Sequence, residues 1–223
     1  MSYILNIDTA VITASVCLAK NDRALVEKVN PSQKDHAAWL HNAIKEVIEE
    51  AALSLQELDA IAVSSGPGSY TGLRVGMAAA KGLCYALQKP LITIGTLKMM
   101  AVAAQGEGPE LLCPMIDARR MEVFTAVYDK NLSEILSPIN VIIEKNSFEE
   151  ILRHNSVSFF GNGSDKFRAV SSSKNAHFKK IEASAKHMMP LSFSEFRQNR
   201  FADLAYAEPF YGKDFYSPFV KPS

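Results

Sequence analysis

One pattern occurs twice in this chain, and it restricts the fold more than any other feature of the sequence. In the first half an apolar, strand-like run ends in Ile7-Asp8-Thr9, and in the second half a similar run ends in Ile116-Asp117-Ala118. A polar turn follows each run at the same offset, Lys20-Asn21-Asp22 in one half and Asp129-Lys130-Asn131 in the other. Self-similarity at a fixed offset indicates that a supersecondary unit has been duplicated.

The first half predicts three strands, a helix, and then two strand–helix pairs. Runs of β-branched and apolar residues favour the strands, and apolar residues at helical spacing favour the helices. The expected strands cover residues 4–8, 14–19, 24–29, 59–64 and 91–94. The first helix is expected to begin with Ser32 as its N-cap and to run to about residue 51, and the other two helices cover 73–87 and 96–105.

The second half begins in the same way and then departs from the first. Strands are expected at 111–117, 122–128, 135–143 and 157–160. A helix before the last of these should begin with Ser147 and Glu150 as a capping box. A loop is expected at 171–175 and a late helix at 194–206, before an aromatic tail from Phe210 to Ser223.

These segments predict an α/β fold built from two ribonuclease-H-like subdomains. The glycine-rich break Gly106-Glu107-Gly108-Pro109 is the expected boundary between them. We therefore expect an N-terminal subdomain of residues 1–106 and a reduced C-terminal subdomain of residues 107–223 that carries the aromatic tail.

Composition excludes several classes of protein. Lys and Arg total 24 and so do Asp and Glu, so the basic excess of a protein that grips nucleic acid directly is missing. Cys17, Cys84 and Cys113 are far apart, which favours buried thiols in a reducing compartment over disulfides or zinc. No signal peptide or membrane-spanning run is recognisable, so a cytoplasmic location is expected.

A glycine-rich segment, Gly66-Pro67-Gly68-Ser69-Tyr70-Thr71-Gly72, follows a strand and opens a helix. Backbone amides and the helix dipole favour anion binding in this context, although the spacing is neither a Rossmann motif nor a P-loop. A tight turn that docks the helix explains the glycines equally well. The candidate contacts to a nucleotide or anion are Asp8, Thr9, Gly66, Gly68 and Ser69.

The helix after this segment carries two stripes of small residues. Gly72, Gly76 and Ala80 form one stripe, and Ala78, Gly82 and Ala86 form the other. Small residues four positions apart allow another helix to approach closely, so this helix is either buried in the core or docked on a partner.

The histidines do not predict a metal or catalytic site. His36 and His41 are five residues apart and point to different sides of their helix, and neither His-Glu-x-x-His nor His-x-x-x-His occurs. No Ser/His/Asp order is recognisable. We expect no catalytic residue and no metal ligand in this chain.

The run from Ser65 to Gly76 closely resembles the signature of the bacterial TsaB (YeaZ) family. Supporting matches follow in the family's order along the chain: Ile4 to Thr9, Asp117 to Val123, Gly161-Asn162-Gly163, and Ala207-Glu208-Pro209-x-Tyr211. The resemblance implies an actin/sugar-kinase/Hsp70-like fold. Ala10 and Val11 depart from the family's pattern, which has hydroxyl residues there, and this departure counts against autonomous nucleotide binding.

The resemblance also implies a function. TsaB is a non-catalytic partner that binds and activates TsaD, the enzyme that transfers threonylcarbamoyl to adenosine 37 of tRNAs reading ANN codons. TsaD holds its metal partly with a His-x-x-x-His pair, and alignment on the preceding strand places Thr96 and Met100 at those positions. Neither side chain is a plausible ligand for that metal. The expected role is therefore that of an accessory subunit.

In that family two helices pack against TsaD, and residues 34–53 and 71–88 are expected to make this contact. The candidate partner-binding residues are His36, Leu40, Ala43, Ile44, Val47, Tyr70, Leu73, Gly76, Met77, Ala80, Leu83 and Leu87. Alone, the chain is expected to pair as a homodimer. The ATPase TsaE is a further implied partner, and tRNA is met only indirectly. No cofactor of its own is implied, while ATP or ADP at the TsaD interface stays open.

Two enzyme functions compete with this interpretation. The first is an ATP-dependent small-molecule kinase or ATPase of the same fold, which would need a second phosphate-binding hairpin. The turn after Asp117 carries Arg119-Arg120 instead of glycine and hydroxyl residues. The second is a metallopeptidase, which the missing histidine pair disfavours. A module that binds tRNA directly is disfavoured by the neutral net charge.

Overall fold

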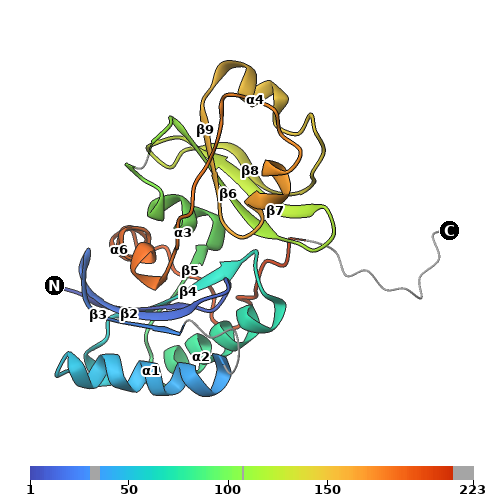
Figure 1. Cartoon of the computed structure of the whole chain (residues 1–223). Helices are drawn as coiled ribbons and strands as arrows, with labels where there is room; N and C mark the ends of the chain where they lie inside the picture. The colour runs from blue at the N-terminus through green and yellow to red at the C-terminus, as the bar shows by residue number, and fades with distance from the viewer. Residues whose placement is uncertain (31–35, 107, 213–223) are drawn as a thin grey trace, which may run out of the picture.

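The computed structural model describes residues 1–30, 36–106 and 108–212 and contains two five-stranded sheets, one from each half of the chain (Figure 1). The first sheet has the order β3-β2-β1-β4-β5. Its strands are β1 (Tyr3–Asp8), β2 (Ala14–Lys20), β3 (Arg23–Asn30), β4 (Ala60–Gly66) and β5 (Leu91–Gly95). The hairpin strands β1, β2 and β3 are antiparallel, and β4 and β5 run parallel to β1.

The second sheet repeats this topology, with the order β10-β9-β6-β7-β8. Its strands are β6 (Leu111–Asp117), β7 (Glu122–Tyr128), β8 (Glu134–Ile142), β9 (Val157–Phe160) and β10 (Ala176–Phe178). Strand β6 takes the place of β1, and β9 and β10 run parallel to it as β4 and β5 do. The predicted duplication is therefore confirmed, and β10 lies where the sequence analysis expected no strand.

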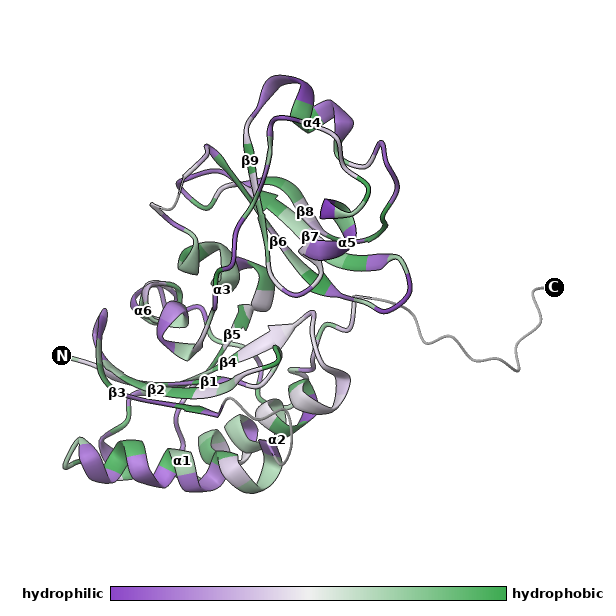
Figure 2. Ribbon diagram, in the orientation of Figure 1, coloured by the Kyte–Doolittle hydropathy of each residue, from purple (hydrophilic) through white to green (hydrophobic). Residues whose placement is uncertain are grey.

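Each sheet carries, on one of its faces, a pair of helices from its own half. On the first sheet these are α1 (His36–Glu50) and α2 (Tyr70–Leu87), and a single turn of 3-10 helix, η1 (Leu55–Glu57), links α1 to β4. Helix α1 alternates hydrophilic and hydrophobic residues along its length (Figure 2), and it buries its apolar stripe on β2 and β3. On the second sheet the corresponding helices are short: α4 (Glu149–His154) and α5 (Ser164–Arg168).

The remaining helices connect the two halves (Figure 1). Helix α3 (Thr96–Ala103) contacts β6 and β7 of the second sheet, and α6 (Met189–Arg197), preceded by η2 (Ala185–Met188), contacts β1 and β5 of the first. One hydrophobic cluster contains residues of both sheets, including Ile4, Ile92, Leu112 and Phe124. Each half therefore completes the core of the other.

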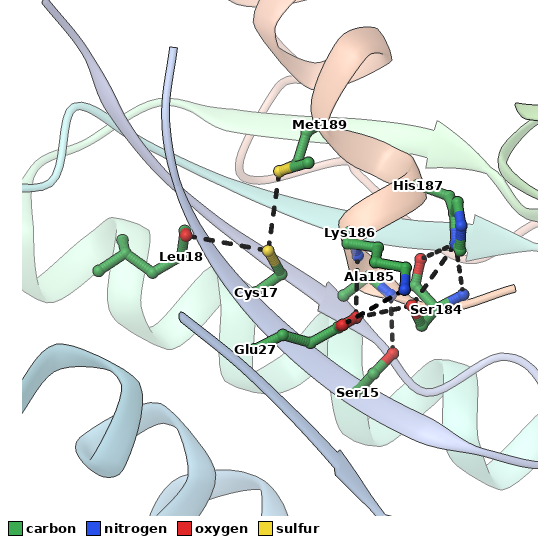
Figure 3. A network of polar contacts seen from close by, with 9 residues as sticks. All are labelled: Ser15, Cys17, Leu18, Glu27, Ser184, Ala185, Lys186, His187 and Met189. Atoms are coloured by element: carbon green, nitrogen blue, oxygen red, sulfur yellow. Dashed lines mark hydrogen bonds and ion pairs between the residues drawn. The ribbon is translucent and has the colours of Figure 1, made fainter. Parts of the chain in front are cut away.

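Polar contacts also join the C-terminal part of the chain to the first sheet (Figure 3). The Ser184 hydroxyl donates to a Glu27 carboxylate oxygen on β3 over 2.6 Å, and the Ala185 amide donates to Ser15 Oγ on β2 over 2.8 Å. The predicted division at residue 106 stays a prediction, but residues 185–202 of the second half lie against the first sheet, through η2 and α6 and through a bridge between Leu91 and Ala202.

Two helix predictions are corrected by the structure. Ser147 does not cap α4: its Oγ accepts from the Glu144 amide over 2.9 Å, and Phe148 in the left-handed region precedes the helix. The late helix covers 189–197 instead of 194–206. The predicted cap Ser32 lies outside the described residues. No helix in the described part of the chain combines the length and apolar character needed to cross a bilayer.

Candidate functional site

The end of β1 meets the start of α2 at the glycine-rich segment. Asp8 is fully buried, and its Oδ1 accepts a hydrogen bond from the Ala10 amide over 2.9 Å. The Thr9 hydroxyl donates to the Gly72 carbonyl over 2.7 Å. The β1–β2 hairpin is thereby joined to the first turn of α2.

Three backbone amides of the glycine-rich segment are occupied by the chain itself. The Ser69 amide donates to the Ala10 carbonyl (2.7 Å), the Gly66 amide to Thr96 Oγ1 (3.2 Å), and the Gly72 amide to Ser69 Oγ, which caps α2 (3.2 Å). A side chain at Gly72 would collide with the Thr9 carbonyl oxygen. The structure thus brings the predicted residues Asp8, Thr9, Gly66, Gly68 and Ser69 together as a tightly packed joint. Anion binding there stays a prediction.

Asp8 has an unusual electrostatic environment. Burial raises its pKa to about 6, while the Ser64 hydroxyl and the Ala10 amide partly offset this rise. Neither Asp8 Oδ2 nor Ser64 Oγ has a partner in hydrogen-bond geometry within the described chain, so burial is the dominant cause of the raised pKa. A carboxyl group in this state is partly protonated near neutral pH.

The equivalent aspartate of the second half, Asp117, is neutralised in another way. Its Oδ1 accepts from the Arg119 amide over 2.6 Å, as Asp8 accepts from Ala10, and also from Lys166 Nζ over 2.8 Å. Burial acts to raise its pKa, but Lys166 and the Arg119 amide bring the pKa below its usual value. Arg119 and Arg120 form the left-handed turn of this hairpin, with φ of 68° and 47°. Lys166 therefore occupies the carboxylate of Asp117.

A cleft of about 390 Å³ lies between the two halves. The β1–β2 hairpin contributes Val11 and Ile12, α3 contributes Met100, and the other wall includes Asn162 and Arg168. Val11 and Ile12 are apolar, and Thr13 supplies the hydroxyl that the hairpin brings to this cleft. The hairpin therefore offers a bound phosphate a single side-chain hydroxyl.

Thr96 and Met100 occupy the positions discussed above for a metal-binding histidine pair. Both side chains are buried, and the Thr96 hydroxyl oxygen accepts a hydrogen bond from the Gly66 amide. A soft thioether and an engaged hydroxyl do not suit a hard divalent ion. Among the described residues, no group of three or more His, Cys, Asp or Glu side chains is close enough to hold a metal.

Most of the predicted partner-binding residues lie in the chain's own core. The buried members are Leu40, Ala43, Ile44, Val47, Leu73, Gly76, Met77 and Ala80. A side chain at Gly76 would collide with Thr9 Oγ1, so this stripe packs on the β1 end of the sheet. His36, Leu83 and Leu87 are half-buried, and Tyr70 is exposed. Partner binding by α1 and α2 stays a prediction. A partner could contact only the side chains of these helices that are exposed.

The second stripe of small residues faces outward. Ala78, Gly82 and Ala86 are exposed, and a side chain at Gly82 would meet no atom of the chain within 4 Å. Tyr85 on the same face is 80% exposed. This flat strip of α2 is the part of the molecule that another helix can approach closely.

A cation–aromatic cluster at the start of α2 was not predicted. Arg74 lies 4.2 Å from the centre of the Tyr70 ring, and its Nε donates to the Tyr211 hydroxyl over 3.1 Å. The two tyrosine rings are 5.0 Å apart. Because Tyr211 is so distant in sequence, no local spacing pattern signals this contact.

Comparison with known proteins gives consistent results. A family model described as "TsaD: tRNA N6-adenosine threonylcarbamoyltransferase" matches residues 28–207. The "tRNA threonylcarbamoyladenosine biosynthesis protein TsaB" of Bacillus subtilis is 33% identical over 144 residues, which cover 63% of this chain and 62% of that protein. The protein of the same name from Escherichia coli is 33% identical over 129 residues, covering 57% of this chain and 55% of that protein. These matches span less than two thirds of the relatives' length.

Solved structures show the same fold over nearly the whole chain. "YeaZ from Pseudomonas aeruginosa" has a TM-score of 0.82 at 25% identity, covering 95% of this chain and all of that one. A Clostridium difficile protein, "Activator of the 2-Hydroxyisocaproyl-CoA Dehydratase", solved with bound ADPNP, has a TM-score of 0.52 at 8% identity, covering 89% and 97%. The second likeness shows the fold alone. Together they identify the α/β architecture as the predicted actin/sugar-kinase/Hsp70-like fold.

Proposed function

The chain belongs to the family described as TsaD, tRNA N6-adenosine threonylcarbamoyltransferase, with homologues named TsaB in several bacteria, and we propose that it is an accessory subunit of threonylcarbamoyladenosine biosynthesis. In this role it binds a TsaD enzyme and activates the transfer of threonylcarbamoyl to adenosine in tRNA. It contributes a docking surface and leaves catalysis to its partner.

The exposed strip of α2 is the observation that carries this proposal. Ala78, Gly82 and Ala86 leave a flat helical surface, and Gly82 has open space in front of it. Helices pack closely where small residues line the contact, and a paired helix from a partner would cover the strip. An exposed glycine inside a helix costs about 1 kcal/mol relative to alanine, so a close approach by a partner offers a physical reason for it.

Three features support a non-catalytic role. Lys166 occupies the carboxylate of Asp117, Thr96 and Met100 are engaged in the core, and the hairpin residues that line the cleft supply a single hydroxyl, that of Thr13. A phosphotransfer enzyme needs metal-held phosphates and a free carboxylate near them. We therefore propose that ATP or ADP is bound, if at all, only together with TsaD, with TsaE as a further partner. Isothermal titration with ATP, with and without TsaD, tests this.

A kinase or ATPase is the second candidate function. It is favoured by the cleft of about 390 Å³ between the halves and by the fold shared with a protein solved with ADPNP. Release of phosphate from ATP by the pure chain, lost in an Asp8→Asn variant, would establish this candidate. We expect no such turnover.

The docking proposal is tested with the Gly82→Arg variant. The new side chain points into open space, so the fold should be retained while close helix approach is blocked. We expect the wild-type chain to co-elute with TsaD and to stimulate tRNA modification, and Gly82→Arg to do neither, with unchanged circular dichroism. Ser172→Arg, which adds the same side chain to an exposed loop of the second half, is the matched control. Normal co-elution of Gly82→Arg would place the interface elsewhere.

A further inference from the structure

The C-terminal strap, defined as residues 200–212, runs beside α2 and is fastened to it at several points. The Ala202 amide donates to the Leu91 carbonyl over 2.8 Å, and the Phe210 amide to the Ser65 carbonyl over 2.7 Å. Lys81 Nζ, from α2, donates to the carbonyls of Ala205 (3.3 Å) and Ala207 (3.0 Å). One lysine therefore holds the middle of the strap.

Helical spacing places the strap next to the exposed strip of α2. Arg74 and Lys81 are seven residues apart and lie on one stripe of the helix, and both contact the strap. Ala78, Gly82 and Tyr85 lie on the adjacent exposed face. Helix α1 contacts α2 as well, and Val75 and Leu83 pack into the core that the two helices share. The strap thus adds a further border to the strip proposed for docking.

Exposed aromatic side chains occur on both elements, although the ring of Phe201 lies beside Phe196 of α6 and Phe210 lines a hollow with Tyr128 of the second half. Tyr70 and Tyr85 belong to α2, and Phe201, Tyr206 and Phe210 belong to the strap. Tyr206, which follows one of the carbonyls held by Lys81, is 84% exposed. Tyrosine, phenylalanine and arginine are enriched at the centres of protein interfaces, where they often dominate the binding energy.

The charge of α2 indicates what kind of partner fits. Its only charged residues, Arg74 and Lys81, are both bonded to the strap, and the strap itself carries Arg200, Asp203 and Glu208. Because these charges nearly balance, a complementary surface would be mainly apolar at its centre and would not be strongly charged. RNA fits less well, because phosphate binding needs several free cations and Lys81 is bonded to the strap.

We propose that the strap and the exposed face of α2 form one continuous docking surface for an apolar-centred face of the partner protein, and that Lys81 is the positioning residue that holds the strap in place. This inference rests on the proposed function, because the partner is the one that docks on α2. It goes beyond that proposal by adding a second element, from the other end of the chain, to the surface.

The test measures the dissociation constant for TsaD with the Tyr206→Ala and Lys81→Met variants of the full chain. Tyr206→Ala removes an exposed ring, so the fold should be unaffected and binding should weaken about tenfold. Lys81→Met keeps the unbranched apolar part of the side chain but loses both carbonyl contacts, so binding should weaken similarly, and hydrogen exchange of the Ala207 amide should accelerate. Ile135→Ala, at an exposed apolar position on β8, is the control and should bind normally.

The outcomes separate this inference from the proposed function. If Gly82→Arg prevents binding while Tyr206→Ala and Lys81→Met bind normally, α2 is the docking site and the strap inference is wrong. If none of the three changes binding, the proposed docking face itself is wrong. Altered self-association, or altered binding of tRNA by the chain alone, with unchanged TsaD affinity would assign the strap to a second copy or to RNA and would also overturn the inference.

Discussion

At the scale of single residues, two equivalent aspartates have different surroundings. Asp8 and Asp117 are each the last residue of the first strand in their half. Each carboxylate accepts a hydrogen bond from the backbone amide two residues later in the chain. Lys166 pairs with Asp117, whereas Asp8 is buried without a cation in contact. The sequence predicts both positions from the repeat, but it does not predict Lys166, which reaches Asp117 only because α5 lies beside β6.

The buried Asp8 carboxyl should make stability depend on pH. Its pKa is about 6 in the folded chain against an ordinary 3.8, so the folded state holds the proton more tightly. Its contribution to stability is fully present below about pH 3.8 and is lost as the pH rises through about 6. We expect Asp8→Asn to be more stable than the wild type at pH 7, by on the order of 2–3 kcal/mol, and the difference to shrink at pH 5.

Urea unfolding at both pH values measures this difference. Asn retains an acceptor for the Ala10 amide and gains a donor toward Ser64. A variant that is less stable at pH 7 would mean that the ionised carboxylate is stabilised by a group other than those identified.

The three cysteines should be unreactive while the chain is folded. All are free and buried, as the sequence predicted, and burial raises the pKa of Cys84 to about 11 and that of Cys113 to about 12. Thiolate is the reactive form, so a thiol reagent at pH 8 should label the native chain slowly and all three cysteines after unfolding. Rapid labelling of one cysteine in the native state would contradict the packing described.

At the scale of elements, α2 shows what sequence patterns can and cannot establish. The two stripes of small residues are evident in the sequence, but their spacing does not say which one faces the sheet. That choice follows from Thr9, which approaches Gly72 and Gly76 from the β1–β2 hairpin. The strap and β10 were missed for a related reason: both are placed by pairing with distant segments, such as Ala202 with Leu91.

The two stripes should respond oppositely to the same substitution. Gly76→Ala places a methyl group against Thr9 Oγ1 and should destabilise the fold by about 1–3 kcal/mol. Gly82→Ala meets open space on an exposed helix and should stabilise it by about 0.5–1 kcal/mol. Thermal unfolding of both variants measures the contrast. Equal effects at the two positions would show that the orientation of α2 is wrong.

At the scale of the whole molecule, the two halves exchange helices. Helix α3 of the first half packs on the second sheet, and α6 of the second half packs on the first. The repeat and the two-part fold could be predicted from the sequence, because each half carries its own strand order. The exchange of helices could not be predicted, because it depends on contacts between residues far apart in the sequence. Met188 packs in the hydrophobic cluster that both sheets share, and Ser192 Oγ donates a hydrogen bond to Asn6 Oδ1 over 2.7 Å.

This exchange predicts cooperative unfolding of the two halves together. Residues of both sheets share one hydrophobic cluster, so neither half retains its core when the other unfolds. Differential scanning calorimetry should show one transition with equal calorimetric and van't Hoff enthalpies. Two resolved transitions would mean that the halves are independent domains.

We propose that this chain acts through a surface and not through a reaction of its own. The rate of threonylcarbamoyl transfer to tRNA tests this proposal when it is measured for TsaD with the wild-type chain, for TsaD with the Gly82→Arg variant, and for the chain without TsaD. We expect stimulation by the wild type, none by Gly82→Arg, and no transfer by the chain alone. Transfer by the chain alone, or full stimulation by Gly82→Arg, would overturn the proposal.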